Sequence, residues 1–282
     1  MKLLRFGPAG SERPGMLDAE GRVRDLSSVI PDITGATIGP DSLAKLAALD
    51  PATLPVIHGE PRLGACVANS PKFVAVGLNY SDHAAESNMP IPAEPILFGK
   101  ATSCIVGPND DVMLPMDSVK LDWEVELGIV IGTKARYVEE AKALDYVAGY
   151  CVINDVSERE YQLERSGQWT KGKGCDTFGP IGPWLVTKDE IPNVSELAMF
   201  CDVNGERRQT GSTATMIFHV PFLVSYISRF MTLMPGDLIA TGTPPGVGLG
   251  MKPPLYLKAG DEMRLGIAGL GEQRQKVVPF KL

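Results

Sequence analysis

The chain has 282 residues and a formal net charge of −7, and its Lys and Arg residues form no basic cluster, which argues against a nucleic-acid-binding surface. Its hydrophobic content of 44 % and charged content of 22 % are typical of a soluble globular protein, and no apolar run approaches the roughly 18 residues that a membrane helix requires. The five cysteines are far apart and form no CxxC pair, so we expect no disulfide framework, no structural zinc site and a cytoplasmic location.

Residues 1–65 are predicted to form a small N-terminal domain of α+β structure. The stretches "KLLRFG" and "GRVRDLSSVI" have the pattern of short strands, and "PDSLAKLAAL" has the pattern of a helix capped by Asp41. The Gly- and Pro-rich stretch "HGEPRLGACVANSPK" marks the boundary, so residues 66–282 form the second domain. The first domain contains no candidate catalytic residue.

The second domain is predicted to be mixed α+β and rich in strands. Eight stretches have strand patterns: "FVAVGLNY", "ILFGKA", "VELGIVIG", "YVAGYCVIND", "GPWLVT", "AMFCDVNGE", "DLIATGTP" and "DEMRLGIAGLG". The Asn204-Gly205 pair fits a type I′ hairpin turn.

Four stretches of this domain predict helices: "SDHAAESN", "YVEEAKAL", "SEREYQLER" and "MIFHVPFLVSYISRFM". The third begins with a capping box, in which Ser157 caps the helix and Glu160 reaches back to it. In the fourth, aromatic residues recur every four positions and are predicted to face the core: Phe218, Phe222, Tyr226 and Phe230.

His83 and Glu86 are three residues apart, so they share a face of the first of these helices. A carboxylate that holds an imidazole makes it a better general base. The pattern H-x-x-E is also common in surface pairs, so the spacing leaves both interpretations open.

Glu124 and Glu126 are two residues apart on a predicted strand and share one face, with Cα atoms about 6.6 Å apart. Side by side and buried, two carboxylates would repel each other and their pKa values would rise. A divalent cation between them removes both problems, and oxygen ligands suit Mg²⁺, Mn²⁺ or Ca²⁺. The alternative is an exposed strand face with two solvated acids.

Three further residues lie where chains often build sites. Asp155 ends an apolar strand, where it could line a site or cap a turn, and Lys173 and Thr243 lie in Gly-rich loops that could meet an anion. No G-x-x-x-x-G-K-[ST] and no G-x-G-x-x-G is present, so nothing predicts a nucleotide-binding fold.

Together, "GLNYSDHAAE", "WEVELGIVIG", "GYCVINDVSERE", "KGKGCDTFGPIGPW" and "PGDLIATGTPPGVG" resemble the fumarylacetoacetate hydrolase family, in the family's order, from about residue 70 to the C-terminus. The resemblance implies a catalytic domain of mixed strands rolled into a β-rich body and a homodimeric assembly. It also implies a divalent metal, Mg²⁺ before Mn²⁺ or Ca²⁺, and assigns roles to eight residues. These are a catalytic dyad (His83 and Glu86), metal ligands (Glu124, Glu126 and Asp155), a contact to the substrate's oxygens (Lys173) and further substrate contacts (Gln162 and Thr243).

The function that follows from the resemblance is metal-dependent hydrolysis of a carbon–carbon bond in a small keto acid. The substrate would be an acylpyruvate or another 2,4-diketo acid, with a 2,4-diketo-3-deoxy sugar acid as one candidate. His83 would take a proton from water, and the metal and Lys173 would hold the enolate charge of the departing pyruvate. The same metal site could serve an oxaloacetate-type decarboxylase, a hydroxymuconate-type isomerase or a ureidoglycolate-type lyase. A metal-stabilised binding protein is the alternative outside the enzymes.

Overall fold

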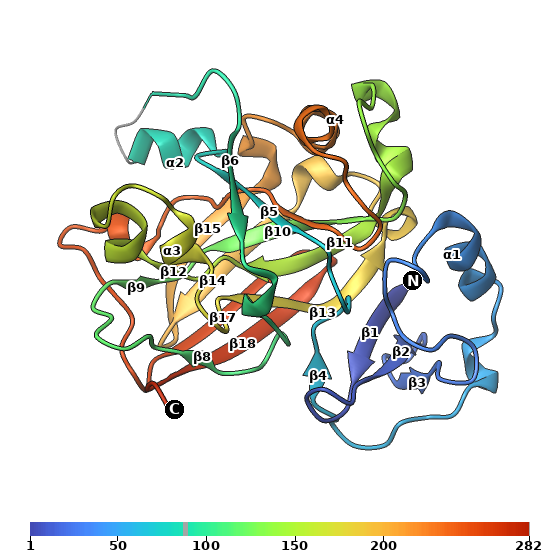
Figure 1. Cartoon of the computed structure of the whole chain (residues 1–282). Coiled ribbons are helices and arrows are strands. Elements are labelled where there is room, and N and C mark those ends of the chain that lie inside the picture. Colours follow the sequence, from blue (N-terminus) through green and yellow to red (C-terminus); the bar gives the residue numbers. More distant parts are fainter. Residues whose placement is uncertain (87–89, 282) are drawn as a thin grey trace.

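The structure of the chain is a computed structural model, which describes residues 1–86 and 90–281 (Figure 1). An 11-stranded sheet and a five-stranded sheet form its body, and a two-stranded ribbon lies beside them. The expected mixed, strand-rich architecture is therefore confirmed. Within the described residues, no helix has the length and apolar character needed to cross a bilayer.

The large sheet has the strand order β3-β2-β1-β13-β11-β10-β16-β5-β6, with β4 paired to β1 and β7 paired to β13. Its strands, in chain order, are β1 (Lys2–Phe6), β2 (Arg13–Leu17), β3 (Val23–Asp25), β4 (Leu63–Gly64), β5 (Phe73–Gly77), β6 (Ile96–Lys100), β7 (Ile105–Val106), β10 (Val125–Ile131), β11 (Val147–Asn154), β13 (Gly179–Thr187) and β16 (Leu238–Ala240). The central strands β10 and β11 are buried along their whole length, which explains their nearly continuous apolar sequence.

The small sheet has the order β15-β14-β17-β18-β8, and β14 and β17 contact the central strand β10. Its strands are β8 (Val112–Met113), β14 (Ala198–Val203), β15 (Glu206–Ser212), β17 (Glu262–Ile267) and β18 (Gly271–Val278). Asn204 and Gly205 both have positive φ angles, 52° and 79°, at the β14–β15 hairpin, so the predicted type I′ turn is confirmed. The ribbon pairs β9 (Leu121–Asp122) with β12 (Ser157–Glu158).

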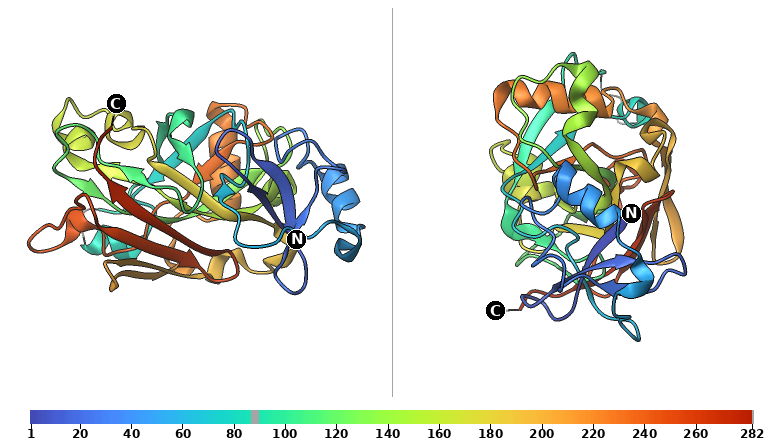
Figure 2. Two further views of the ribbon diagram at one scale, coloured as in Figure 1. Left: turned by 90° about the horizontal axis from the view of Figure 1, so that it is seen from below. Right: turned by 90° about the vertical axis from the view of Figure 1, so that its right-hand side faces the viewer.

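The N-terminal strands continue the large sheet. β1 pairs antiparallel with β13, where Leu3 lies opposite Leu185. Figure 2 shows this N-terminal part, in blue, at one end of the elongated body. The division of the chain into domains of residues 1–65 and 66–282 stays a prediction.

Four α-helices are described: α1 (Pro40–Ala47), α2 (Ser81–Glu86), α3 (Thr170–Lys173) and α4 (Val220–Phe230). In α1 the capping position belongs to Gly39, and Asp41 lies in the first turn, so the predicted Asp41 cap is wrong. Pro40 occupies the first helical position, which its fixed φ and missing N–H favour, and this places the cap two residues ahead of Asp41. The predicted helix 81–88 is described only as far as Glu86, and its last two residues lie outside the described part.

Two other predicted helices take different forms. The second predicted helix, "YVEEAKAL" (137–144), is replaced by a 3₁₀ helix over Glu140–Tyr146. The predicted helix 157–165 is wrong at its start, because Ser157 is paired with Asp122 in the ribbon and its hydroxyl donates to the Asp155 carbonyl at 2.9 Å. The chain turns helical only at Glu160, whose N–H donates to the Glu158 carboxylate at 3.0 Å, and the turn that follows is a π-helix.

The aromatic stripe of α4 does not face the core. The buried face of the helix carries Val220, Leu223, Val224 and Ile227, and Phe230 is 62 % exposed. The aromatic rings contact one another along the other side, two pairs stacked and the last, Tyr226 and Phe230, edge to face. Two serines fix this rotation, because Ser225 donates to the Val138 carbonyl at 2.7 Å and Ser228 accepts from the Val138 N–H at 2.9 Å. The prediction that the stripe faces the core is therefore wrong for Phe222, Tyr226 and Phe230, whereas Phe218, which precedes α4, packs against the core.

Candidate active site

Three buried carboxylates meet where β10 begins and β11 ends. Glu124 directly precedes β10, Glu126 lies on it, and Asp155 directly follows β11. The antiparallel register places Val125 opposite Asn154, and the Asp155 N–H donates to the Glu124 carbonyl at 2.9 Å. One carboxylate oxygen from each acid lies within 4.8 Å of the others, so the predicted ligand trio is brought together.

Three buried cations surround this acidic cluster. The Lys173 ammonium lies 2.8 Å from Glu124 and 2.8 Å from Asp155. The guanidinium of Arg159 lies 2.6 Å from Glu124, and the Lys100 ammonium pairs with Asp155. Lys100 and Arg159 were not predicted from the sequence. The sequence offers only weak indications of them: Lys100 lies near the end of an apolar predicted strand, and Arg159 follows Asp155 by four residues.

Glu124 and Glu126 differ in how far nearby cations compensate their negative charges. Burial raises the pKa of Glu124, but the Lys173 ammonium and the Arg159 guanidinium outweigh this and hold that pKa well below its usual range. Burial raises the pKa of Glu126, and the nearby Asp155 and Glu124 raise it further. Among the described residues Glu126 forms no ion pair, and its carboxylate accepts one hydrogen bond, from the Gly242 N–H at 2.8 Å.

The cluster therefore fits a hard divalent cation. Its donor atoms are carboxylate oxygens alone, they lie close enough to share one ion, and the Glu126 carboxylate lacks a cationic partner in the described structure. Mg²⁺, Mn²⁺ and Ca²⁺ are the ions that prefer such ligands.

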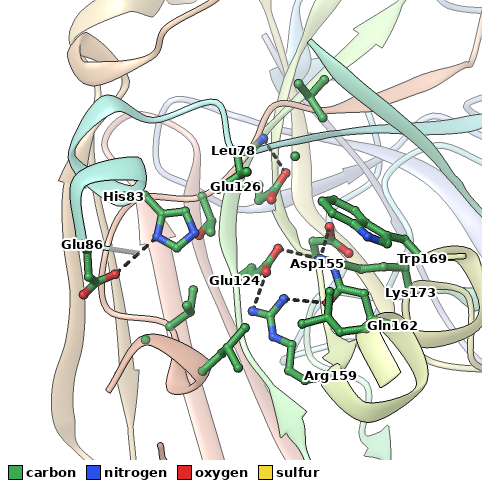
Figure 3. A pocket seen from close by; sticks show the side chains of 18 of the residues that line it. Leu78, His83, Glu86, Glu124, Glu126, Asp155, Arg159, Gln162, Trp169 and Lys173 are labelled. Carbon is green, nitrogen blue, oxygen red and sulfur yellow. Dashed lines mark hydrogen bonds and ion pairs between the residues drawn. The ribbon is translucent and has the colours of Figure 1, made fainter. Parts of the chain in front are cut away.

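The second functional group is the pair of His83 and Glu86 on α2 (Figure 3). The His83 Nδ1 atom lies 3.3 Å from Glu86 Oε2, and the imidazole side chain is 12 % exposed. Both Glu86 oxygens accept from the Gly246 N–H, each at 3.2 Å. The helix itself is held by Asp82, which accepts from the Thr215 hydroxyl at 3.2 Å. The Gly246 N–H thus holds the Glu86 carboxylate in place, and this carboxylate can orient the His83 imidazole.

A cavity of about 430 Å³ joins the two groups, a volume typical of small-molecule sites. All eight residues that the sequence predicted for the site line it, the dyad from α2 and the acids from β10 and the end of β11. Apolar side chains make up much of the remaining wall: Leu78, Phe98, Trp169, Val247, Leu249 and Met251. The Trp169 ring lies against Gly77, where an added Cβ would come within 2.5 Å of it, and meets Phe98 edge to face.

The two predicted substrate contacts differ in what they can offer. Gln162 is buried on the π-helix, and its Oε1 atom accepts from Arg159 at 3.0 Å, so its amide N–H₂ is the group left for a ligand. Thr243 donates its hydroxyl proton to the Val125 carbonyl at 2.9 Å and accepts from Gln209 at 2.8 Å. The Thr243 oxygen has one lone pair left, so a substrate could bind it only by donating a hydrogen bond to that oxygen.

Lys173→Met is expected to lower kcat by about 10²-fold, the usual cost of losing one preorganised electrostatic group in a site. The substitution keeps an unbranched side chain that is one atom shorter, and it removes the buried ammonium between Glu124 and Asp155. Steady-state kinetics with Mn²⁺ present would measure the loss, beside a thermal unfolding curve. Lys171→Met, two residues earlier and exposed, is the matched control. Wild-type kinetics in Lys173→Met would contradict a role for this ammonium in turnover.

Comparison with known proteins places the chain in a family. Residues 72–278 match the model of the fumarylacetoacetate hydrolase C-terminal domain. A relative from Burkholderia cenocepacia, named only as a hydrolase, is 63 % identical over 98 % of both chains.

Two solved structures are similar to this chain over its full length. Maleylpyruvate hydrolase from Sphingobium, in complex with manganese(II) and pyruvate, is 29 % identical with a TM-score of 0.83, and covers 100 % of both chains. The 5-carboxymethyl-2-hydroxymuconate delta-isomerase from Mycobacterium smegmatis is 31 % identical with a TM-score of 0.77, again over 100 % of both chains. The chain belongs to the fumarylacetoacetate hydrolase family.

Proposed function

We propose that this chain hydrolyses the carbon–carbon bond of an acylpyruvate, converting the diketo acid and one water into pyruvate and a carboxylic acid. The observation that carries the proposal is that the His83–Glu86 dyad and the acidic cluster line one cavity of about 430 Å³. A base for water and a cation-binding acidic cluster are the two elements that this reaction requires. A binding protein without turnover would have no use for the dyad.

The chain's own residues account for water activation. Glu86 accepts from Nδ1–H of His83, which leaves Nε2 of the imidazole as the atom that takes the proton from water. The hydroxide equivalent then adds to the carbonyl carbon of the acyl group. The protonated imidazole is stabilised by the Glu86 carboxylate, which the Gly246 N–H holds in place.

Bond cleavage releases pyruvate as its enolate, which then takes up a proton. A divalent cation held by Glu124, Glu126 and Asp155 would supply Lewis-acid polarisation of the substrate's oxygens. Lys173 and Arg159 add fixed positive charge beside the acidic cluster, and they require no rearrangement when the enolate charge develops.

The apolar wall favours a hydrocarbon acyl group over a polyhydroxylated one. Trp169 and Phe98 form a rigid aromatic corner, and the Val247, Leu249 and Met251 side chains continue the wall. Hydroxyl groups buried against such a surface would lose hydrogen bonds to water without replacing them. A 2,4-diketo-3-deoxy sugar acid is therefore the less favoured substrate of the two classes.

Tautomerisation of a hydroxymuconate-type acid is the second candidate, because one structural neighbour is named as such an isomerase. It uses the same enolate chemistry and a base, but no water is added. The products therefore separate the two reactions.

The test is product analysis of the Mn²⁺-loaded protein over acylpyruvates with apolar acyl groups, a 2,4-diketo-3-deoxy sugar acid, oxaloacetate, a hydroxymuconate and ureidoglycolate. We expect equimolar pyruvate and carboxylic acid from the apolar acylpyruvates, with one ¹⁸O atom from labelled water in the carboxylic acid. Tautomer without pyruvate would establish the isomerase instead. Carbon dioxide from oxaloacetate alone, or glyoxylate from ureidoglycolate alone, would establish a decarboxylase or a lyase. Binding without any turnover would contradict an enzyme.

A further inference from the structure

Asp122 and Trp123 lie directly ahead of Glu124, and neither lines the cavity. Both side chains are fully buried. Asp122 belongs to the ribbon strand β9, where it pairs with Ser157 two residues before Arg159. The two residues therefore lie behind the acidic cluster and cannot contact a substrate there.

The Asp122 carboxylate accepts four hydrogen bonds. Oδ1 accepts from the backbone N–H of Gly248 at 2.7 Å and of Trp123 at 2.9 Å. Oδ2 accepts from the Leu249 N–H at 3.0 Å and from Nε of Arg159 at 2.8 Å. One buried carboxylate thus joins the chain segment 246–249 to the arginine that pairs with Glu124.

Trp123 holds the other end of the same segment. Its indole Nε1–H donates to the Gly246 carbonyl at 3.1 Å. The N–H of Gly246 is the group that donates to Glu86. A continuous series of contacts therefore runs from Glu124 through Arg159 and Asp122 to the segment 246–249, and from there to Glu86 and His83.

The segment has little stiffness of its own, because Gly246 and Gly248 are two of its four residues and glycine restricts the backbone least. Its orientation must come from outside contacts, and Asp122 supplies two of them at adjacent backbone N–H groups. We propose that Asp122 is a positioning residue that fixes the segment 246–249, and through it Glu86, relative to the acidic cluster. The kinetic part of this inference rests on the proposed function, and its structural part does not.

The test begins with Asp122→Asn in the full chain. The amide keeps the size of the carboxylate, but its N–H₂ would face the N–H groups of Arg159 and Leu249, donor against donor. We expect kcat on an acylpyruvate to fall by about 10- to 100-fold, the range typical of lost supporting contacts, with KM and Mn²⁺ affinity nearly unchanged. Amide hydrogen exchange should become faster at residues 246–249.

A double-mutant cycle with Glu86→Gln separates positioning from general destabilisation. If Asp122 acts through Glu86, the double variant should be hardly slower than Glu86→Gln alone. Additive losses in kcat, or wild-type exchange at residues 246–249, would overturn the proposal. Asp202→Asn is the control, since Asp202 is also buried and ion-paired but lies on β14 and does not line the cavity.

Trp123→Phe keeps the test decisive if Asp122→Asn fails to fold. It removes the Nε1–H bond to Gly246 together with part of the buried indole, and keeps an aromatic ring in the core. Faster exchange at Gly246 and a lower kcat are expected, and no change in either would overturn the role of this junction. If the wild-type chain hydrolyses no acylpyruvate, the proposed function fails, and the exchange data alone decide the role of Asp122.

Discussion

His83→Ala is expected to lower kcat by about 10²- to 10⁴-fold, the range for losing a positioned general base. The imidazole lines the cavity and is oriented by Glu86, but it does not belong to the acidic cluster. Binding of Mn²⁺ and of oxalate, an analogue of the pyruvate enolate, should therefore stay close to that of the wild-type protein. Steady-state kinetics and calorimetry of the same preparations measure both quantities.

His219→Ala is the matched control for this substitution. His219 precedes α4, is exposed, and makes no side-chain capping bond. Loss of Mn²⁺ binding in His83→Ala would mean that His83 is a metal ligand and that the dyad is wrong. A variant with wild-type kcat would show that the reaction does not need this base, which would favour a decarboxylase or an isomerase with another proton carrier.

Removal of divalent metal by EDTA is expected to abolish turnover, and added Mg²⁺ or Mn²⁺ to restore it. Glu126→Gln should raise the metal concentration needed for half-maximal activity, because it removes the negative charge that has no cationic partner among the described residues. Zinc should be a poor substitute, since the cluster offers neither Cys nor His ligands. Metal titrations of activity and calorimetry measure these effects.

Glu196→Gln, an exposed acid outside the cavity, is the control for the metal titration. Full activity in metal-stripped protein would contradict the metal site. An unchanged metal requirement in Glu126→Gln would mean that Glu126 is not a metal ligand. The roles of Glu124 and Asp155 would then be tested by substitutions of those two residues.

The sequence was most informative where one strand carries both structure and chemistry. The alternation around Glu124 and Glu126 predicted a buried strand with two acids on one face, and the structure places both acids at the cavity. The resemblance to the family named eight residues, and all eight line the cavity. Local patterns of this kind predict side-chain orientation reliably, because strand periodicity fixes the face of the sheet on which a residue lies.

The sequence was less informative where distant segments decide the outcome. Lys100 and Arg159 are buried only because Asp155, Glu124 and Asp122 are present to compensate their charges, and no local pattern encodes those partners. The rotation of α4 depends on two hydrogen bonds with Val138, whose carbonyl accepts from the Ser225 hydroxyl and whose N–H donates to the Ser228 hydroxyl.

The longest of the strands that were not predicted, β18, was missed for a similar reason. In β18, Gln273 and Gln275 occupy buried positions that an apolar residue would normally take. Their amides are satisfied by backbone carbonyls, among them that of Val152 at 2.8 Å. A polar residue in such a position hides the alternation on which strand prediction depends.

The chain separation of the contacts also bears on the order in which the site can form during folding. Lys173 joins Asp155 across 18 positions and Glu124 across 49, whereas Gly246 reaches Glu86 across 160. Contacts between distant positions cost more loop-closure entropy and form later than local ones. The contacts of Lys173 with Glu124 and Asp155 therefore need only the chain as far as Lys173, whereas Glu126 still requires the later-made Gly242 as its hydrogen-bond donor. The proton-transfer half of the site must wait until the segment after β16 has been synthesised and has docked.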